Sequence, residues 1–273
     1  MINPYFGITP PETKVPGPPR APPTSVQNVE SAPVITRRRS VRQFVPPQHG
    51  AWAMLLLPYV IGVIAAGFRR PDLPLLGAWL AGYLLSYYAF QAIKSRRPRR
   101  YVRQLQLYGL STLLLATPVV VARPAVLLYA PVFAVLVAVN AWYAHRRRER
   151  AFLNDLAAVT QSCLMVFVVA TVAGAPPSTV LTPFTLVLLY LTGTILYVKT
   201  MIRERDSQSY RTASAIFHAT ALAAVVTQGP LPTAVFTLLL VRAWLLPGRS
   251  LTPKQVGLLE IAASTLVLLA AVT

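Results

Sequence analysis

The stretch LPLLGAWLAGYLLSYYAFQAI, residues 73–93, is followed at once by the cationic segment KSRRPRR, residues 94–100. The first segment contains no charged residue, and a helix needs about 20 predominantly apolar residues to cross the hydrocarbon core of a bilayer. The second segment ends such a helix at the headgroup level, where lysine and arginine side chains remain in contact with water. This combination predicts a membrane helix rather than the core of a soluble domain.

The composition of the whole chain agrees with this interpretation. Of its 273 residues, 55% are hydrophobic and only 12% are charged, whereas a soluble domain carries about 25% charged residues. We therefore predict an all-α, polytopic membrane helical bundle with about nine transmembrane helices. The predicted spans are residues 51–68, 73–93, 105–122, 124–144, 152–174, 180–198, 212–227, 231–246 and 256–272.

Residues 1–45 differ in composition from the rest of the chain. They are rich in proline, serine and threonine, show no apolar periodicity, and carry a basic cluster at residues 37–42. Such a segment cannot bury enough apolar surface to fold alone. We predict a disordered, proline-rich cytoplasmic tail over 1–45 and a transmembrane domain over 46–273.

The basic residues are distributed unevenly along the chain. Their excess gives a net charge of +18, which taken alone would suggest nucleic-acid binding. They lie instead in alternate loops, and with the N-terminus inside only Arg69, Arg70 and Arg123 fall on the outer side. This pattern follows the positive-inside rule. We predict that the N-terminus is inside, that the C-terminus is outside, and that the partner is membrane lipid and no nucleic acid.

Two candidate groups lie near the cytoplasmic ends of the first two spans. His49 precedes Trp52, and it either donates a hydrogen bond or a proton to a ligand or belongs to an interfacial anchor around that tryptophan. Lys94 begins the cationic segment, which either binds phosphate or anionic headgroups or only sets the membrane topology.

A third group consists of Asn140, Asn154 and Asp155, at the ends of two spans joined by a very short loop. Because the loop is short, we expect these side chains to be neighbours. A carboxylate within a span is costly and needs a partner. A magnesium ion and a structural arginine partner are both compatible with the sequence.

A fourth group follows the sixth predicted span. Lys199 and Arg203 lie four residues apart and share a face if the helix continues, and Glu204 and Asp206 follow them. Cations with two carboxylates suit a diphosphate, with or without Mg²⁺. The alternative is a solvated loop whose charges pair with one another.

The remaining polar residues favour structural roles. We expect Arg242 to pair with Glu260, and His218 to form a hydrogen bond between helices. Cys163 is the single cysteine, so an intramolecular disulfide is impossible, and the scarcity of cysteine and histidine argues against a zinc site.

Several blocks of the sequence resemble the bacterial YwiC-like proteins. They are QHGAW at 48–52, LNDLAA at 153–158, YVKTMIRER at 197–205, RAWLLP at 242–247 and PKQ at 253–255. The resemblance covers roughly residues 46–273. It implies an integral protein of the bacterial cytoplasmic membrane with no settled biochemical function.

The topology is also similar, more distantly, to the UbiA-type prenyltransferase superfamily. That resemblance implies transfer of a prenyl group from a prenyl diphosphate, held with Mg²⁺ by acidic motifs after the second and sixth spans. Glu204 and Asp206 follow the sixth span, but the segment after the second span contains no acid. This is a departure from the pattern, because two-metal diphosphate binding needs several carboxylates.

The topology and the placement of the charges suggest roles for the candidate residues. The expected ligands of the diphosphate or another anion are Lys94, Asn140, Asn154, Lys199 and Arg203. The expected metal ligands are Asp155, Glu204 and Asp206, and the expected catalytic or acceptor-contacting residues are His49, Asp155 and Tyr197. The alternative function is a non-enzymatic transporter or scaffold that binds an anionic lipid or a small anion at the same face.

Overall fold

The computed structural model describes residues 44, 49–249 and 251–273. Within these residues every regular element is helical, which confirms the all-α prediction. The predicted tail over 1–45 lies, except for Phe44, outside the described residues.

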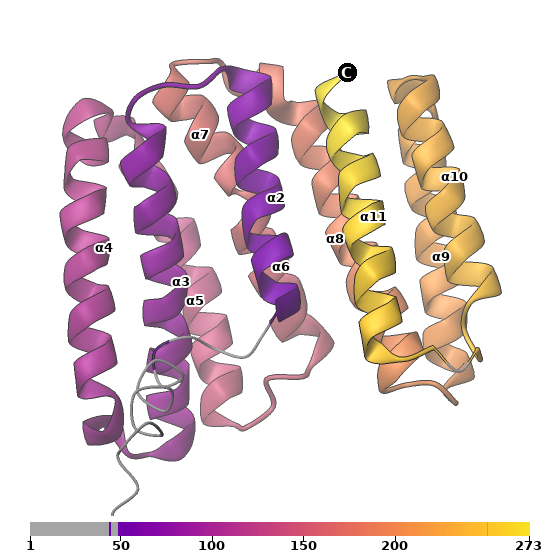
Figure 1. The fold of residues 1–273 in the computed structure, drawn as a ribbon, viewed down its shortest axis with the longest axis horizontal. Helices are drawn as coiled ribbons and strands as arrows, with labels where there is room; N and C mark the ends of the chain where they lie inside the picture. Colours follow the sequence, from indigo (N-terminus) through magenta and orange to yellow (C-terminus); the bar gives the residue numbers. More distant parts are fainter. Residues whose placement is uncertain (1–43, 45–48, 250) are drawn as a thin grey trace, which may run out of the picture. The chain divides into compact units, whose positions relative to one another are not determined.

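Successive helices run in alternating directions, except that Met165–Ala173 continues the direction of Phe152–Cys163, and they are joined by short loops or by 3₁₀ turns (Figure 1). In chain order they are α2 (His49–Ala66), α3 (Asp72–Ser95), α4 (Val102–Ala122), α5 (Ala130–His145), α6 (Phe152–Cys163), α7 (Met165–Ala173), α8 (Leu181–Ile202), α9 (Gln208–Val225), α10 (Pro230–Leu245) and α11 (Pro253–Val272). The 3₁₀ turns are η1 (Pro98–Tyr101), η2 (Pro124–Tyr129), η3 (Pro177–Val180) and η4 (Val226–Gln228).

Every predicted span corresponds to a helix, and the span predicted over 152–174 corresponds to α6 and α7, which are interrupted at Leu164. Among the described residues, 6 helical stretches are long and apolar enough to cross a membrane. Trp52–Ala66 and Pro230–Leu245 are apolar but shorter. The chain is thus a multi-pass membrane protein by length and composition, and the count of nine spans stays a prediction.

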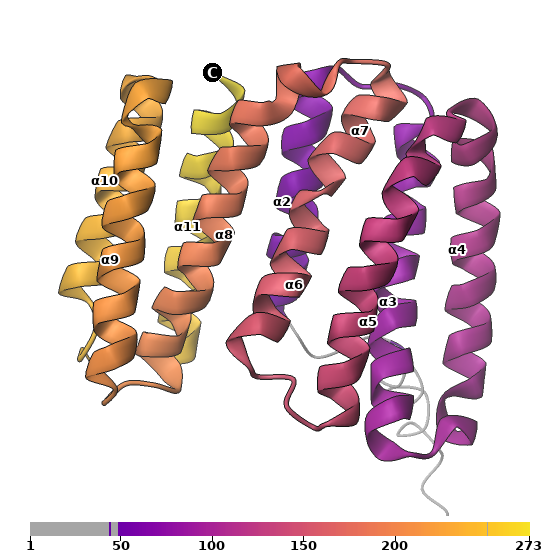
Figure 2. The same cartoon turned by 180° about the vertical axis from the view of Figure 1, so that it is seen from behind.

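The helices form two layers, with α4 at one edge beside α3. One layer contains α3, α2, α11 and α10, and the other contains α5, α6 with α7, α8 and α9 (Figures 1 and 2). The layers contact each other through the pairs α3–α5, α2–α7, α11–α8 and α10–α9.

The largest buried cluster includes residues of α2 and of every helix from α6 to α11. Gly62 of α2 faces α7, where a Cβ atom on this glycine would lie 3.1 Å from the Cβ of Val169 and 3.2 Å from the Cα of Val166. The hydroxyl of Ser162 donates a hydrogen bond to the carbonyl of Met54 at 2.7 Å. The missing side chain therefore allows α2 and α7 to approach closely, as small residues do between membrane helices.

The outer helices carry the opposite pattern of burial. In the apolar part of Pro177–Ile202, which contains α8, 61% of the residues are buried, whereas in the apolar part of Pro98–Ala122, which contains α4, only 6% are buried. Leu110, Leu113 and Leu114 of α4 are exposed. A surface this apolar is unfavourable in water and suits contact with lipid.

The loops divide between the two ends of the bundle. The loops 96–101, 146–151, 203–207 and 246–249 share one end, which is the lower end in Figure 1 and is called the basic end below. The opposite end carries Arg69, Arg70 and Arg123. The structure thus gathers the basic loops at one end, as the alternation of spans requires. Which side of the membrane this end faces stays a prediction.

Candidate anion-binding site at the basic end

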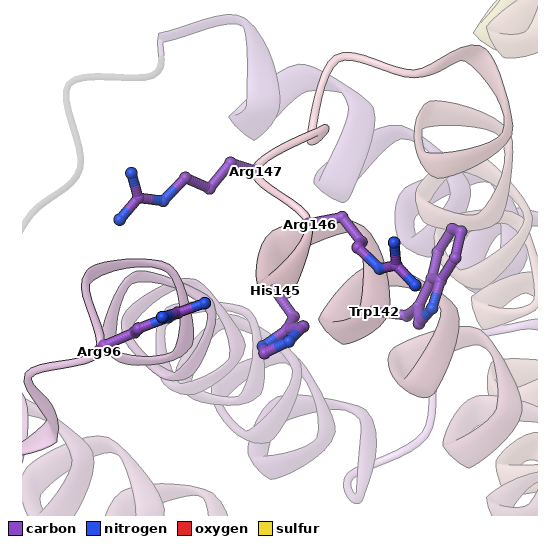
Figure 3. A pocket seen from close by; sticks show the side chains of 5 residues that line it. All are labelled: Arg96, Trp142, His145, Arg146 and Arg147. Carbon is purple, nitrogen blue, oxygen red and sulfur yellow. The ribbon is translucent and has the colours of Figure 1, made fainter.

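An open pocket of about 670 Å³ lies at the basic end, where α3 and α5 end side by side. Five residues line this pocket: Arg96, Trp142, His145, Arg146 and Arg147 (Figure 3). Arg96 follows α3, and the others belong to the last turn of α5 and the residues after it. The pocket therefore brings together two basic loops, 96–101 and 146–151, that lie about 50 residues apart along the chain.

The backbone of this pocket is unusual at two positions. Arg96 has a φ of 55° and Arg147 a φ of 54°, and they are the non-glycine residues with positive φ in the described part of the chain. The N–H of Arg96 donates to the carbonyl of Ile93 at 3.3 Å, and that of Arg147 to the carbonyl of Ala144 at 3.0 Å. Left-handed backbone at a non-glycine residue is strained, and such strain concentrates at functional sites.

The charges of the pocket are not neutralised by acidic neighbours. Arg96, Arg146 and Arg147 are exposed. The ion pairs found among the described residues involve other cations. The guanidinium of Arg146 lies 5.4 Å from the ring centroid of Trp142, alongside the indole (Figure 3). The pocket thus offers guanidinium groups that are free to bind an anion.

Glu149 is the carboxylate nearest to this pocket in sequence, and it is already engaged. Its side chain forms an ion pair with Lys94 at 2.6 Å. Partial burial would raise the pKa of Glu149, but the hydrogen bond and charge of Lys94, together with the charge of Arg150, hold it below its ordinary value. Lys94, an expected ligand of the diphosphate, is therefore paired with an acid of the chain itself.

The asparagines expected at the anion site hold the loop 146–151 in place. The amide of Asn140 donates to the side-chain oxygen of Asn154 at 2.9 Å and to its carbonyl at 3.0 Å. The amide of Asn154 donates in turn to the carbonyl of Glu149 at 2.7 Å. The expected proximity of these two residues is found, and their contacts position the loop that carries Arg146 and Arg147.

Lys199 and Asp155 meet, although the sequence placed them in separate groups. The ammonium of Lys199 lies 2.9 Å from the carboxylate of Asp155 and donates to the carbonyl of Arg150 at 2.7 Å. Lys199 is only 7% exposed. The carboxylate partner of Asp155 is thus this lysine, and the pair connects α6 and the preceding loop to α8.

The other residues expected to bind the diphosphate or a metal lie apart from this pair. Arg203 is the C-cap of α8 and is exposed, as is Asp206, while Glu204 is half-buried. Within the described residues no group of three His, Cys, Asp or Glu side chains could hold a metal ion. The structure does not bring Asp155, Glu204 and Asp206 together, and magnesium binding stays a prediction.

The two remaining candidates lie outside the pocket or outside the described side chains. His49 is the first residue of α2, and its side chain is not among those described. Tyr197 is fully buried, with the guanidinium of Arg242 at 4.1 Å from its ring centroid. Tyr197 is thus a buried residue of α8 that contacts α10, away from the pocket.

Sequence reasoning included Arg96 in the cationic segment 94–100, a possible phosphate site, but it named none of the other residues that line the pocket as a ligand. The segment 94–100 and the loop after α5 were each recognisable as basic, but nothing in the sequence showed that they face one another. The available signal was the low acid content of both loops, since Glu149 is the single carboxylate in residues 94–103 and 145–151.

Comparisons with known proteins agree with the sequence resemblance. The model of a family described as YwiC-like protein matches residues 45–170, which include every residue that lines the pocket. The uncharacterized protein YwiC of Bacillus subtilis is 31% identical over 224 residues, covering 81% of this chain and 93% of that protein. An uncharacterized protein of Haemophilus influenzae is 31% identical over 229 residues, covering 81% of this chain and 94% of that protein. No solved structure matches the chain.

Proposed function

The chain belongs to the YwiC-like family, and from this premise we propose that it binds an amphiphile with a phosphate or diphosphate head at the pocket of the basic end. The observation that carries the proposal is the pocket itself, in which three arginines and a histidine surround a space of about 670 Å³ beside a tryptophan. Ligand pockets are commonly about 300–1,000 Å³, so a headgroup with the first part of its tail has enough room.

Arginine side chains bind a phosphate group with more directional hydrogen bonds than an isolated positive charge, such as a lysine ammonium, can provide. A guanidinium presents parallel N–H groups that bind two oxygens of one phosphate. Arg96, Arg146 and Arg147 have no ion-pair partner in the part of the chain that the structure describes. An incoming anion would thus gain their charge without first breaking an existing pair.

The position of the pocket favours a lipid-like ligand over a soluble one. Trp142 is 51% exposed and lies in the last turns of α5, where a tryptophan is typical of the headgroup level of a membrane. Val132 and Val135 of the same helix are exposed apolar side chains. A ligand with its head among the arginines could thus place its tail along α5 in the bilayer.

A prenyl diphosphate meets this description, and prenyl transfer is the enzymatic form of the proposal. It is supported by the more distant similarity to the UbiA-type prenyltransferases and by the cationic character of the site. Lys94 and Lys199 are each paired with a carboxylate, so in this proposal the arginines of the pocket bind the diphosphate. They would stabilise its charge as it leaves the prenyl group.

The acids of the chain do not fit a shared magnesium site in this structure. Asp155 is paired with Lys199, and Glu204 and Asp206 do not join it in a metal-binding group of described residues. Any Mg²⁺ in the proposal therefore arrives with the diphosphate, to which this ion binds readily.

The non-enzymatic alternative uses the same pocket. A transporter or scaffold would hold an anionic lipid or a small anion there without breaking a covalent bond. The open form of the pocket and the exposure of its arginines support binding equally well in both cases. Turnover of the ligand therefore decides between the two functions.

Native mass spectrometry of the purified protein tests the proposal. The protein is incubated with farnesyl diphosphate, geranylgeranyl diphosphate or phosphatidylglycerol, each with and without Mg²⁺. We expect one ligand per chain, and about tenfold weaker retention after Arg96→Gln, Arg146→Gln and Arg147→Gln are combined, because charge-assisted hydrogen bonds are lost.

The matched control changes three arginines of the same two loops that do not line the pocket. Arg99, Arg100 and Arg148 are exposed and lie outside the lining residues. Changing them to glutamine removes the same charge and should leave retention nearly unaltered. Equal losses in both triple variants would show a diffuse attraction to the basic end, and no adduct with any probe would refute the proposal. Release of diphosphate with an acceptor would identify the transferase.

A further inference from the structure

A second polar cluster lies inside the helices α8 to α11, away from the pocket. Arg242 of α10 forms an ion pair with Glu260 of α11 through its Nη1 atom, at 2.5 Å from Oε1. The two side chains are only 10% and 17% exposed. The other carboxylate oxygen accepts hydrogen bonds from the hydroxyls of Tyr190 at 3.1 Å and Thr194 at 3.0 Å. Both oxygens of Glu260 are therefore engaged.

Arg242, by contrast, uses only part of its hydrogen-bonding capacity. Its Nε and Nη2 atoms are buried and have no hydrogen-bond partner within the described chain. These two atoms form the side edge of the guanidinium, whose parallel N–H groups match the two oxygens of a carboxylate or phosphate. Buried donors without a partner are rare in native proteins, and they indicate a water or an ion at that position.

Neighbouring groups from two other helices are in the same condition. The guanidinium lies 4.1 Å from the ring centroid of Tyr197 on α8, and the hydroxyl of this fully buried tyrosine also lacks a partner among the described residues. The same holds for the hydroxyl of Ser214 on α9, which is fully buried. Several unused donors thus occur in one small part of the bundle.

Helix packing relates the positions of Ser214 and Tyr197 along the bundle. Gly193 of α8 faces His218 of α9, where an added Cβ atom would lie 2.9 Å from the Nε2 atom. Tyr197 is one turn after Gly193, and Ser214 is one turn before His218 on a helix that runs in the opposite direction. The close approach of the two helices at the glycine therefore places Tyr197 and Ser214 at the same level of the bundle.

We propose that the free edge of Arg242 binds one oxyanion, a carboxylate or a phosphate group, with the hydroxyl of Tyr197 as a further donor. The bound anion and Glu260 share the charge of Arg242. This site is separate from the pocket at the basic end and does not depend on the function proposed for that pocket.

Isothermal titration calorimetry of the full-length protein in detergent tests this proposal, with inorganic phosphate and acetate as probes. The titrations use the combined glutamine variant of Arg96, Arg146 and Arg147, in which the pocket at the basic end no longer competes for phosphate, and here we expect saturable binding of one anion per chain. Arg242→Lys should weaken it about tenfold, because lysine keeps the charge but lacks the parallel N–H pair. Tyr197→Phe should weaken it several-fold, and Glu260→Gln should strengthen it because the competing negative charge is removed while the shape is retained.

The control variants separate this site from the pocket and from folding defects. Arg249→Lys changes an exposed arginine of the loop after α10 and should leave the affinity unaltered. Phosphate binding without acetate binding would assign a phosphate ligand, and the reverse would assign a carboxylate. The inference is overturned if neither anion binds, or if Arg242→Lys and Tyr197→Phe, monodisperse with unaltered circular dichroism, bind as the combined glutamine variant alone does.

Discussion

The left-handed backbone at Arg96 and Arg147 allows the strain of the pocket to be measured separately from its charge. The perturbation replaces each arginine by alanine in one variant and by glycine in another. Both replacements remove the same guanidinium, but alanine keeps the Cβ atom that makes a positive φ unfavourable. The difference in stability between the two variants at one position therefore reports the backbone strain less the entropy that glycine adds to the unfolded chain.

The magnitude follows from the observed φ values of 55° and 54°. A non-glycine residue in this region costs about 1–2 kcal/mol, while glycine at a compatible site costs about 0.4–1 kcal/mol through the entropy of the unfolded chain. The glycine variant should thus be about 0.5–1 kcal/mol more stable than the alanine variant at each of the two positions.

The assay is unfolding of the purified protein in mixed micelles, followed by circular dichroism, alongside the retention of geranylgeranyl diphosphate by native mass spectrometry. Arg99 provides the matched position, since it lies in the 3₁₀ turn η1 and has no positive φ. At Arg99 the glycine variant of the protein should be less stable than the alanine variant by about 0.5–1 kcal/mol. At Arg96 and Arg147, glycine and alanine should weaken ligand retention equally.

Two results would refute this reasoning. If alanine and glycine give the same stability at Arg96 and Arg147, the left-handed backbone stores no strain in this pocket. If both variants keep full retention of the ligand, the strained arginines are not its ligands, and the strain needs a purely structural explanation.

Three further predictions concern the elements that hold the site in place. Lys199→Met should destabilise the fold by about 3 kcal/mol, because it leaves Asp155 without its partner; unfolding in mixed micelles measures this, and pairing the change with Asp155→Asn should restore most of the loss. Gly62→Val should cost about 2 kcal/mol by forcing α2 away from α7, whereas Gly257→Ala, where a Cβ atom would meet nothing within 4 Å, should be tolerated; an equal effect of both would contradict the packing. The pKa of Glu149 is lowered in the folded state, so its ion pair contributes its full stability above the ordinary carboxyl pKa and loses it as the pH falls through the lower folded pKa. The stability difference from Glu149→Gln, at most about 1 kcal/mol for a pair this exposed, should therefore shrink as the pH falls below the ordinary carboxyl pKa and vanish once Glu149 is protonated in the folded protein; unfolding in mixed micelles at several pH values measures this.

Much of the helical architecture could be predicted from the sequence because hydrophobicity and length are local properties. The nine predicted spans correspond to helices, and the weakest of them, over 212–227, matches α9 (Gln208–Val225). The break at Leu164 was not predicted, because neither a proline nor a glycine lies near it in the run 152–174. It depends on tertiary packing, where α6 and α7 both contact α2.

The candidate site could be predicted only in outline. The proximity of Asn140 and Asn154 follows from the short loop between their helices, and it is found. The pairing of Lys199 with Asp155 joins helices that are not connected by one loop, so no local signal indicated it. For the same reason Lys94 and Lys199 were expected to be free for a ligand, whereas both are paired with acids.

The sequence by itself determined that this chain is an all-α, multi-pass membrane protein whose basic loops share one end, because these properties depend on the order and polarity of consecutive residues. The tertiary structure decided which cations remain unpaired. Each ion pair depends on which helices are neighbours, and in a bilayer that choice is made by close packing of small residues such as Gly62 and by interhelical hydrogen bonds rather than by the hydrophobic pattern. The free arginines of the pocket and the free edge of Arg242 are therefore visible only once the helices are assembled.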